Sequence, residues 1–230
     1  MNKLFFITVL FIITCTALSQ SLPDGYILIY HQDFSSGTAI NDLRFSNPDS
    51  WKISEFKENR SLEFQHQTAY EPLFPSPRIL GIIKDHIFGD FILEADLMQT
   101  GHNNEPAETG ILFSIKDSSR FYYISLSDRQ TDSTQGIFLV RNASLEKVSD
   151  WQTDSIVWGN NKWHKVRVER SIVNRVVNVY FDDMKKPVMT TRNPVLVMGY
   201  IGFGSFASAG RIDNIKVWAP TSIPEEADFF

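Results

Sequence analysis

Apolar and polar residues alternate with a period of two along most of this 230-residue chain, and helical spacing is found nowhere. Alternating runs rich in β-branched and aromatic residues, separated by turn residues, are typical of antiparallel strands. The pattern predicts an all-β fold, an antiparallel two-sheet sandwich or jelly roll. The runs expected to form strands are 26–33, 61–65, 79–84, 90–98, 110–115, 121–127, 136–141, 162–170, 175–181, 200–206 and 211–218.

Two of these runs, 110–115 and 121–127, are apolar at both parities. We expect such strands when one face of a sheet packs the core and the other face forms a partly covered groove. That groove is the first place to look for a function.

The first 19 residues are predicted to be a cleaved secretory signal. Met-Asn-Lys supplies the positive start, residues 4–18 supply the apolar run, and Ala17-Leu18-Ser19 supplies a small-x-small cleavage site. The apolar run is shorter than the ~20 residues that a membrane span needs, so the mature chain is expected to have no span. A second interpretation makes Cys15 a lipidated residue. The protein is therefore expected to be secreted or periplasmic, with a lipid anchor as the alternative.

Residues 20–220 are expected to form one domain and 221–230 a flexible acidic tail, because no repeat or linker divides the chain before its proline-broken end. Cys15 is the only cysteine, so the mature fold must be stabilised by its core and not by disulfides. The formal net charge is −5 and there is no basic stripe. These features argue against nucleic acid as a partner and leave neutral ligands open.

The order of segments resembles the concanavalin A-like lectin/glucanase superfamily over about residues 24–218. Within it, the chain is most similar to secreted bacterial laminin G-like domains and to the 3-keto-disaccharide hydrolase family, which share a D-F-x-L-E strand followed by a G-I-x-F strand. The resemblance implies a jelly-roll sandwich with a concave sheet that handles carbohydrate, and leaves binding or cleavage open. The segments that carry it are WKI (51–53), FGDFILEADL (88–97), GILFSIKDSSRFYYISLS (110–127), NKWHKVRVER (161–170), VNVYFDD (177–183), GYIGFGSF (199–206) and GRIDNIKVW (210–218).

Glu94 and Asp96 share one face of the predicted strand 90–98, and the apolar residues at odd positions share the other. The segment Glu-Ala-Asp-Leu-Met-Gln resembles the E-x-D-x-x-E strand of family 16 glucanases, where the first Glu is the nucleophile, the Asp tunes it and the last Glu is the acid/base. Gln99 stands at that last position, and an amide does not exchange a proton at neutral pH. A retaining glycosidase needs two carboxyl groups about 5 Å apart. Family 16 catalysis is therefore disfavoured unless Glu105 or Glu108, just beyond, supplies the missing acid.

Aromatic side chains are the second kind of candidate, because a sugar ring stacks its C–H faces on an aromatic surface. Arg120 and Tyr123 would lie beside Glu94 if their strands are neighbours in one sheet; a buried, hydroxyl-capped Tyr123 is the equal alternative. Trp151 and Trp158 fall in a loop-rich segment, where an exposed indole would be a stacking platform.

Three other large side chains are expected to be structural. Trp163 opens a predicted strand and Trp218 closes the last one, positions where an indole more often plugs a sandwich than meets a ligand. His164 has the parity of apolar neighbours and is expected to pack in the core.

The resemblance implies no required cofactor, with structural calcium as the exception. Many members place Ca²⁺ where the first and last strands meet, held by an Asp in a segment such as Arg-Ile-Asp-Asn-Ile. Asp213, with Asp33 as a partner, matches this arrangement loosely, and hydrogen bonds at a turn or strand end are the alternative for each. The histidines lack metal-binding spacing, which argues against zinc.

Two main hypotheses of function follow. The favoured one is a secreted carbohydrate-binding module that holds an oligo- or polysaccharide in a concave groove. The alternative is a glycan-cleaving enzyme, a glycosidase or a 3-keto-disaccharide hydrolase, in which Glu94 and Asp96 do the chemistry. A structural domain without a sugar ligand is a weaker third. The residues expected to contact the sugar are Glu94, Asp96, Gln99, Arg120, Tyr123 and Trp151.

Overall fold

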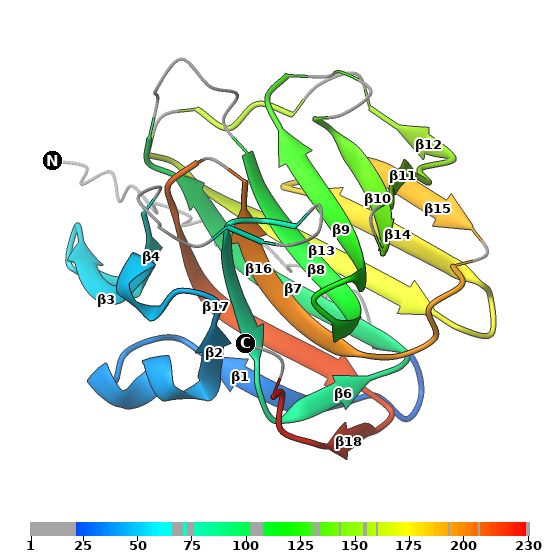
Figure 1. The fold of residues 1–230 in the computed structure, drawn as a ribbon, viewed down its shortest axis with the longest axis horizontal. Helices are drawn as coiled ribbons and strands as arrows, with labels where there is room; N and C mark the ends of the chain where they lie inside the picture. The colour runs from blue at the N-terminus through cyan, green and yellow to red at the C-terminus, as the bar shows by residue number, and fades with distance from the viewer. Residues whose placement is uncertain are drawn as a thin grey trace, which may run out of the picture.

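The computed structural model describes residues 22–65, 71–72, 76–101, 108–129, 131, 134–142, 144–153, 156–159, 161–192, 194–206 and 208–228. The predicted signal, Cys15 and Glu105 lie outside these ranges. The described chain forms two antiparallel sheets that overlap face to face, as the sequence predicts (Figure 1). None of the helices within these ranges is both long and apolar enough to cross a membrane.

The larger sheet has nine strands. They are β1 (Ile27–Gln32), β3 (Trp51–Phe56), β4 (Asn59–Phe64), β7 (Phe91–Gln99), β12 (Trp151–Gln152), β13 (Trp163–Ser171), β14 (Val176–Phe181), β15 (Met189–Arg192) and β17 (Gly210–Ala219). Their order across the sheet is β12, β15, β14, β13, β7, β17, β4, β3, and β1 also pairs with β17. The predicted strand 90–98 therefore lies in the middle of this sheet.

The second sheet has seven strands. They are β2 (Leu43–Phe45), β5 (Ile79–Ile83), β8 (Glu108–Asp117), β9 (Arg120–Ser127), β10 (Gly136–Arg141), β11 (Ser144–Lys147) and β16 (Tyr200–Ser205), in the order β11, β10, β9, β8, β16, β5, β2. A separate pair joins β6 (His86–Phe88) to β18 (Ser222–Pro224), and two short 3-10 helices, η1 (Gly37–Asp42) and η2 (Pro48–Ser50), flank β2.

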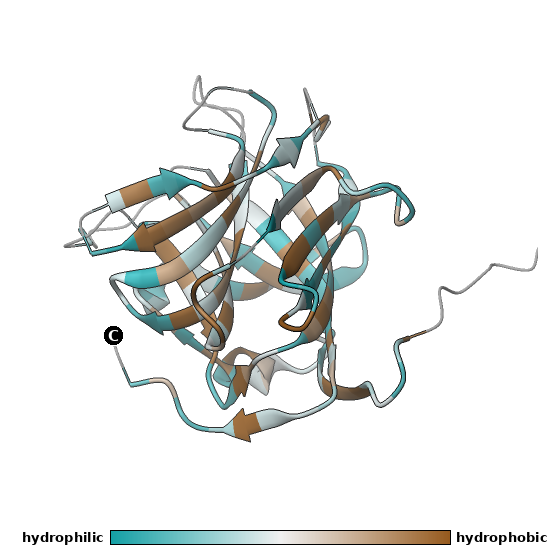
Figure 2. Ribbon diagram, turned by 90° about the vertical axis from the view of Figure 1, so that its right-hand side faces the viewer, coloured by the Kyte–Doolittle hydropathy of each residue, from teal (hydrophilic) through white to brown (hydrophobic). Residues whose placement is uncertain are grey.

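The hydrophobic core lies between the two sheets. In β13, Val166 and Val168 are fully buried, whereas Lys165, Arg167 and Glu169 alternate with them and face away from the second sheet. Figure 2 views the sandwich from the side and shows this alternation of hydrophobic and hydrophilic residues along the strands. Full burial of one such valine contributes about 1.5 to 3 kcal/mol. The period-two pattern of the sequence thus decides which face of each strand is inside.

The outer face of the seven-stranded sheet is apolar and buried as well. Leu112, Phe121, Tyr123 and Val140 belong to a second apolar cluster and are at most 2% exposed. We call this surface the covered face. A Cβ added at Gly110 would lie 2.0 Å from Cε2 of Tyr123, so only glycine lets that ring cross β8. Runs 110–115 and 121–127 are buried on both faces, as their double-sided apolarity predicts. The prediction that their outer face forms a partly covered groove for a ligand is wrong, because the second apolar cluster packs that face.

The C-terminal segment differs from the loose tail expected at 221–230. Its first residues form β18 against β6, and the Ala227 N–H donates to the Lys84 carbonyl at 2.8 Å. Ala227 is 1% exposed and belongs to the second cluster. These backbone hydrogen bonds and this burial outweigh the proline, since Pro224 stands in an edge strand, where its missing N–H costs little.

Candidate functional site

The strand parity predicted for Glu94 and Asp96 is confirmed. The odd positions from Phe91 to Leu97 are at most 1% exposed in the core, and the two carboxylates face away from the second sheet with intermediate exposure. Cross-strand register places Arg167 opposite Glu94 and Lys165 opposite Asp96. We call this outer surface of the nine-stranded sheet the polar face; it carries Glu94, Asp96, Lys165, Arg167, Glu169, Asn178 and Thr190.

Cations pair with both Glu94 and Asp96 on the polar face. Glu94 Oε1 accepts from Arg167 Nε at 2.8 Å and from Nη2 at 2.5 Å, and both side chains are less than a fifth exposed. Asp96 accepts from Lys165 Nζ at 2.8 Å and from Asn214 Nδ2 at 2.8 Å. Carboxylates held in this way act as structural hydrogen-bond acceptors.

Gln99 and Glu108 do not join this pair, contrary to expectation. Gln99 has the inward parity of the core residues, is 0% exposed, and donates from its amide to Thr109 Oγ1. Glu108 belongs to β8 of the other sheet and faces the covered face. The alternation of β7 continues to its last residue, so Gln99 stays inside the sandwich, where a sugar on the polar face does not reach it, contrary to the predicted sugar contact.

Arg120 and Tyr123 also lie on the other sheet, so the prediction that they share a groove with Glu94 is wrong. Tyr123 is 2% exposed and packs edge-to-face against Phe206, with ring centroids 5.2 Å apart. Arg120 stands at the start of β9 and forms an ion pair with Asp117 at 2.5 Å. Sequence order does not reveal which strands share a sheet, and β7 and β9 are in different ones.

The burial of the tryptophans differs in part from the sequence prediction. Trp151 is 43% exposed, as expected for a platform, but Trp158 is 2% exposed and donates from Nε1 to the Leu126 carbonyl at 3.0 Å. Trp163 and Trp218, expected in the core, have outward parity and intermediate exposure. Parity against the buried valines of the same strands was the signal that could have placed both indoles correctly.

The packing role expected for His164 is confirmed. It is 1% exposed, its Nδ1 lies 2.8 Å from Asp182 Oδ2, and its ring stacks on Phe181 with centroids 4.6 Å apart. Its Nε2 bonds to the Trp158 carbonyl. His164 therefore anchors the buried Trp158 segment and takes no part in the polar face.

The two aspartates expected to bind calcium have other partners in the structure. Asp213 is 3% exposed; its Oδ2 accepts from Asn59 Nδ2 at 2.7 Å and its Oδ1 from the Asn214 N–H at 2.7 Å. Burial, together with Asp96 and Asp33, raises the pKa of Asp213. Asp33 accepts from the Ser35 N–H at 3.0 Å. Within the described ranges no group of three or more His, Cys, Asp or Glu side chains is placed to hold a metal ion, and calcium binding stays a prediction.

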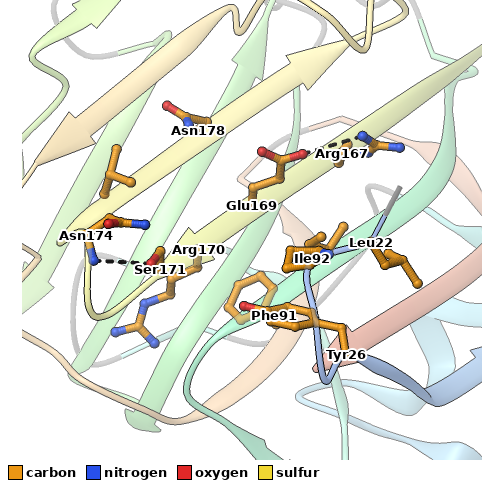
Figure 3. Close-up of a pocket in the computed structure, with 12 residues that line it drawn as sticks. Leu22, Tyr26, Phe91, Ile92, Arg167, Glu169, Arg170, Ser171, Asn174 and Asn178 are labelled. Atoms are coloured by element: carbon orange, nitrogen blue, oxygen red, sulfur yellow. Dashed lines mark hydrogen bonds and ion pairs between the residues drawn. The ribbon is translucent and has the colours of Figure 1, made fainter. Parts of the chain in front are cut away.

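A pocket of about 410 Å³ opens on the polar face at one end of β7 and β13 (Figure 3). Leu22, Tyr26 and Ile92 lie on one side of it, and Asn174 stands on the opposite side (Figure 3). The floor carries Arg167, Glu169 and Asn178 from neighbouring strands. The turn between β13 and β14 positions Asn174, whose N–H donates to Ser171 Oγ at 3.2 Å.

Charge inside the pocket is balanced by close pairs. Arg167 Nη1 lies 3.4 Å from Glu169 Oε1, and the Tyr180 hydroxyl donates to Glu169 Oε2 at 3.0 Å. Burial and the Glu169 charge raise the pKa of Tyr180 to about 12. Burial, Asp90 and Glu169 likewise raise the pKa of Tyr26. Both phenols are therefore neutral near pH 7, where each hydroxyl can donate and accept.

This pocket combines an aromatic ring, apolar side chains and convergent amide and carboxyl groups, the mixture found in sites for polyhydroxylated ligands. Sequence reasoning missed Tyr26, Glu169, Asn174 and Asn178. The alternation in 163–170 indicates that Glu169 faces outward, but only the fold brings the segment before β1 against β7 and β13.

Comparison with known proteins finds solved structures that share this fold. No protein-family model matches the sequence, and neither does any curated protein. The carbohydrate binding module CBM66 from Bacillus subtilis is 14% identical, with a TM-score of 0.56, and the match covers 77% of this chain and 96% of that one. A protein of unknown function with a galectin-like fold from Bacillus subtilis is 13% identical, with a TM-score of 0.58 and coverage of 86% and 97%. The lectin from Bauhinia forficata in complex with GalNAc is 12% identical, with a TM-score of 0.51 and coverage of 86% and 99%.

The fold is a lectin-like antiparallel β-sandwich. The fold class predicted from the sequence is thereby confirmed, and the neighbours agree with the superfamily resemblance at the level of the fold. The finer resemblance to laminin G-like and 3-keto-disaccharide hydrolase domains stays a prediction. At identities of 12 to 14% the likeness concerns the fold, and function must be argued from the site.

Proposed function

We propose that this protein is a carbohydrate-binding module whose ligand occupies the pocket on the polar face. The observation that carries the proposal is the composition of that pocket, where Tyr26 faces Asn174 across a floor containing Glu169 and Asn178. Tyr26 offers a ring on which a sugar's C–H face packs, while the amides and the carboxylate bind its hydroxyls.

The structural neighbours support this proposal at the level of the fold. One is a carbohydrate binding module and another is a lectin in complex with GalNAc. Neither transfers a sugar identity or a binding residue to this chain, because the sequences are too different. The proposed ligand is therefore an oligo- or polysaccharide, with no particular sugar specified.

We favour binding over cleavage because the two predicted catalytic residues are held by cations. Glu94 is bound by Arg167, and Asp96 is bound by Lys165 and Asn214. A retaining glycosidase also needs a second carboxyl group about 5 Å away as acid/base, and the residue at the corresponding position, Gln99, is an amide buried in the sandwich.

We also propose that the protein acts outside the cytoplasm, secreted or periplasmic. The motif at residues 1–19 supports export, with a lipid anchor through Cys15 as the alternative.

A glycan array followed by isothermal titration calorimetry tests the proposal. We expect the mature protein to bind at least one glycan without releasing reducing sugar. Asn178→Ala and Tyr26→Ala should each weaken binding by about tenfold, as expected for one lost hydrogen bond or stacking contact. Lys116→Ala, an exposed change on β8 of the other sheet, is the control and should leave the affinity unchanged. An empty array, or equal affinity in all four proteins, would contradict the proposal; turnover abolished by Glu94→Gln would establish the enzyme alternative.

A further inference from the structure

Cross-strand register places one continuous row of side chains over the polar face. Glu169 of β13 is paired with Asn178 of β14, Asn178 with Thr190 of β15, and Thr190 with Trp151 of β12. Directly opposed residues in antiparallel strands point to the same side of the sheet. Trp151 therefore stands on the same side as the pocket, at the edge of the sheet.

A side-chain contact confirms that this row faces the same side of the sheet as the pocket. Thr190 Oγ1 donates to Asn178 Oδ1 at 3.0 Å, and Asn178 lines the pocket. The row between the pocket and Trp151 thus consists of uncharged hydrogen-bonding groups, and it ends on an indole that is 43% exposed. A single exposed apolar side chain is ordinary on a protein surface. Its alignment with the pocket through three registered strand pairs is the observation that points to a ligand.

Strand spacing sets the distance between the two ends. Neighbouring strands lie about 4.8 Å apart, so Trp151 is roughly 10 Å beyond Asn178, two strands away. One sugar ring seated in the pocket does not reach the indole. A chain of several sugar rings crossing β14 and β15 does.

We propose that the ligand is an extended oligosaccharide or polysaccharide segment that runs across the strands from the pocket to Trp151, where a distal sugar ring stacks on the indole. The inference rests on the proposed function and sharpens it, because it assigns the protein to binders of glycan chains and not of single sugars or chain ends. Asn178 contacts the middle of the chain, Thr190 supports the Asn178 side chain from below, and Trp151 holds the far end.

Calorimetry with oligosaccharides of increasing length tests the inference. The probes are cello-, xylo- and arabino-oligosaccharides from disaccharide to hexasaccharide, titrated into the wild-type protein, Trp151→Ala, Trp151→Phe and Asn178→Ala. Leu145→Ala is the matched control, since Leu145 is 40% exposed on β11, the edge strand of the other sheet.

We expect wild-type affinity to rise with chain length until the chain spans the row. Trp151→Ala should lose about tenfold for the hexasaccharide and leave the disaccharide unchanged, whereas Trp151→Phe keeps most of the gain and Leu145→Ala keeps all of it. Equal loss for short and long chains, or no loss for the hexasaccharide, would overturn the inference alone. The proposed function would be overturned if Asn178→Ala left disaccharide affinity unchanged, or if the protein bound none of the three series and no glycan on the array.

Discussion

The two outer faces of this sandwich differ in the side chains that the outward-facing residues of their strands place there: polar and paired on one face, apolar and buried on the other. On the polar face, Glu94 and Arg167 form ion pairs at the surface beside an open pocket. On the covered face, Leu112 and Tyr123 are buried in a second apolar cluster. Both faces belong to antiparallel sheets of one domain, so the difference comes from side-chain pattern and not from architecture. Strands that alternate leave a face accessible to a ligand, whereas strands apolar at both parities use both faces for packing.

The buried carboxylate of Glu108 on the covered face shows the contrast most clearly. Glu108 is 8% exposed and accepts from the Phe206 N–H at 3.2 Å, from Ser205 Oγ at 3.3 Å and from Ser125 Oγ at 3.4 Å. Burial raises its pKa to about 7, because these neutral donors only partly compensate the lost hydration. Glu94, by contrast, has a guanidinium beside it.

The largest loss of stability is expected from adding a methyl group on the packed covered face. Gly110→Ala places a Cβ 2.0 Å from the buried Tyr123 ring, and we expect it to lower the free energy of unfolding by about 3 to 4 kcal/mol, measured by chemical denaturation. Gly37→Ala is the control, because its added Cβ meets only Arg60 Nη2 at 3.6 Å. Similar stability of the two variants would mean that the covered face is not packed as described.

A pH titration of stability probes the carboxylate on the covered face. The pKa of Glu108 is higher in the folded protein, about 7, than its ordinary value of 4.5, so the folded state holds the proton more tightly. Its contribution to the free energy of unfolding is therefore full below about pH 4.5 and declines as pH rises to about 7, by on the order of 2 to 3 kcal/mol. Denaturation at several pH values should show that decline in the wild type and not in Glu108→Gln. Parallel pH profiles for the two proteins would contradict the account.

A smaller difference is expected between the stability contributions of the two ion pairs on the polar face. The side chains of Glu94 and Arg167 are 18% and 13% exposed, whereas Lys165 of the other pair is 47% exposed. Glu94→Ala should therefore cost about 1 to 2 kcal/mol of stability by leaving a shielded guanidinium short of a partner, and Lys165→Ala about 0.5 kcal/mol or less. Double-mutant cycles measure the coupling energy of each ion pair. Equal coupling energies for Glu94–Arg167 and Asp96–Lys165 would refute the expected difference.

The sequence predicts the fold class and the sidedness of individual strands well. Alternation in 90–98 correctly places Glu94 and Asp96 outside and the odd positions inside, and double-sided apolarity identifies the strands of the covered face. Both are local properties, fixed by the period-two geometry of a strand. They need no knowledge of which strands are neighbours.

The composition of the site could not be predicted, because it depends on long-range pairing. Tyr123 was expected near Glu94, but the two belong to different sheets. Asn178 meets Glu169 through the β13–β14 register, and Tyr26 reaches the same pocket from before β1. Trp158 is drawn inside by its hydrogen bond to Leu126 and its contact with His164, neither of which has a local signal.

A crystal structure of the protein with a bound oligosaccharide would locate the ligand directly. We expect the sugar to lie on the polar face, in contact with Asn178 and Glu169 and with one ring against Tyr26. A sugar seated instead on the covered face, against Tyr123 and Phe206, would contradict this expectation.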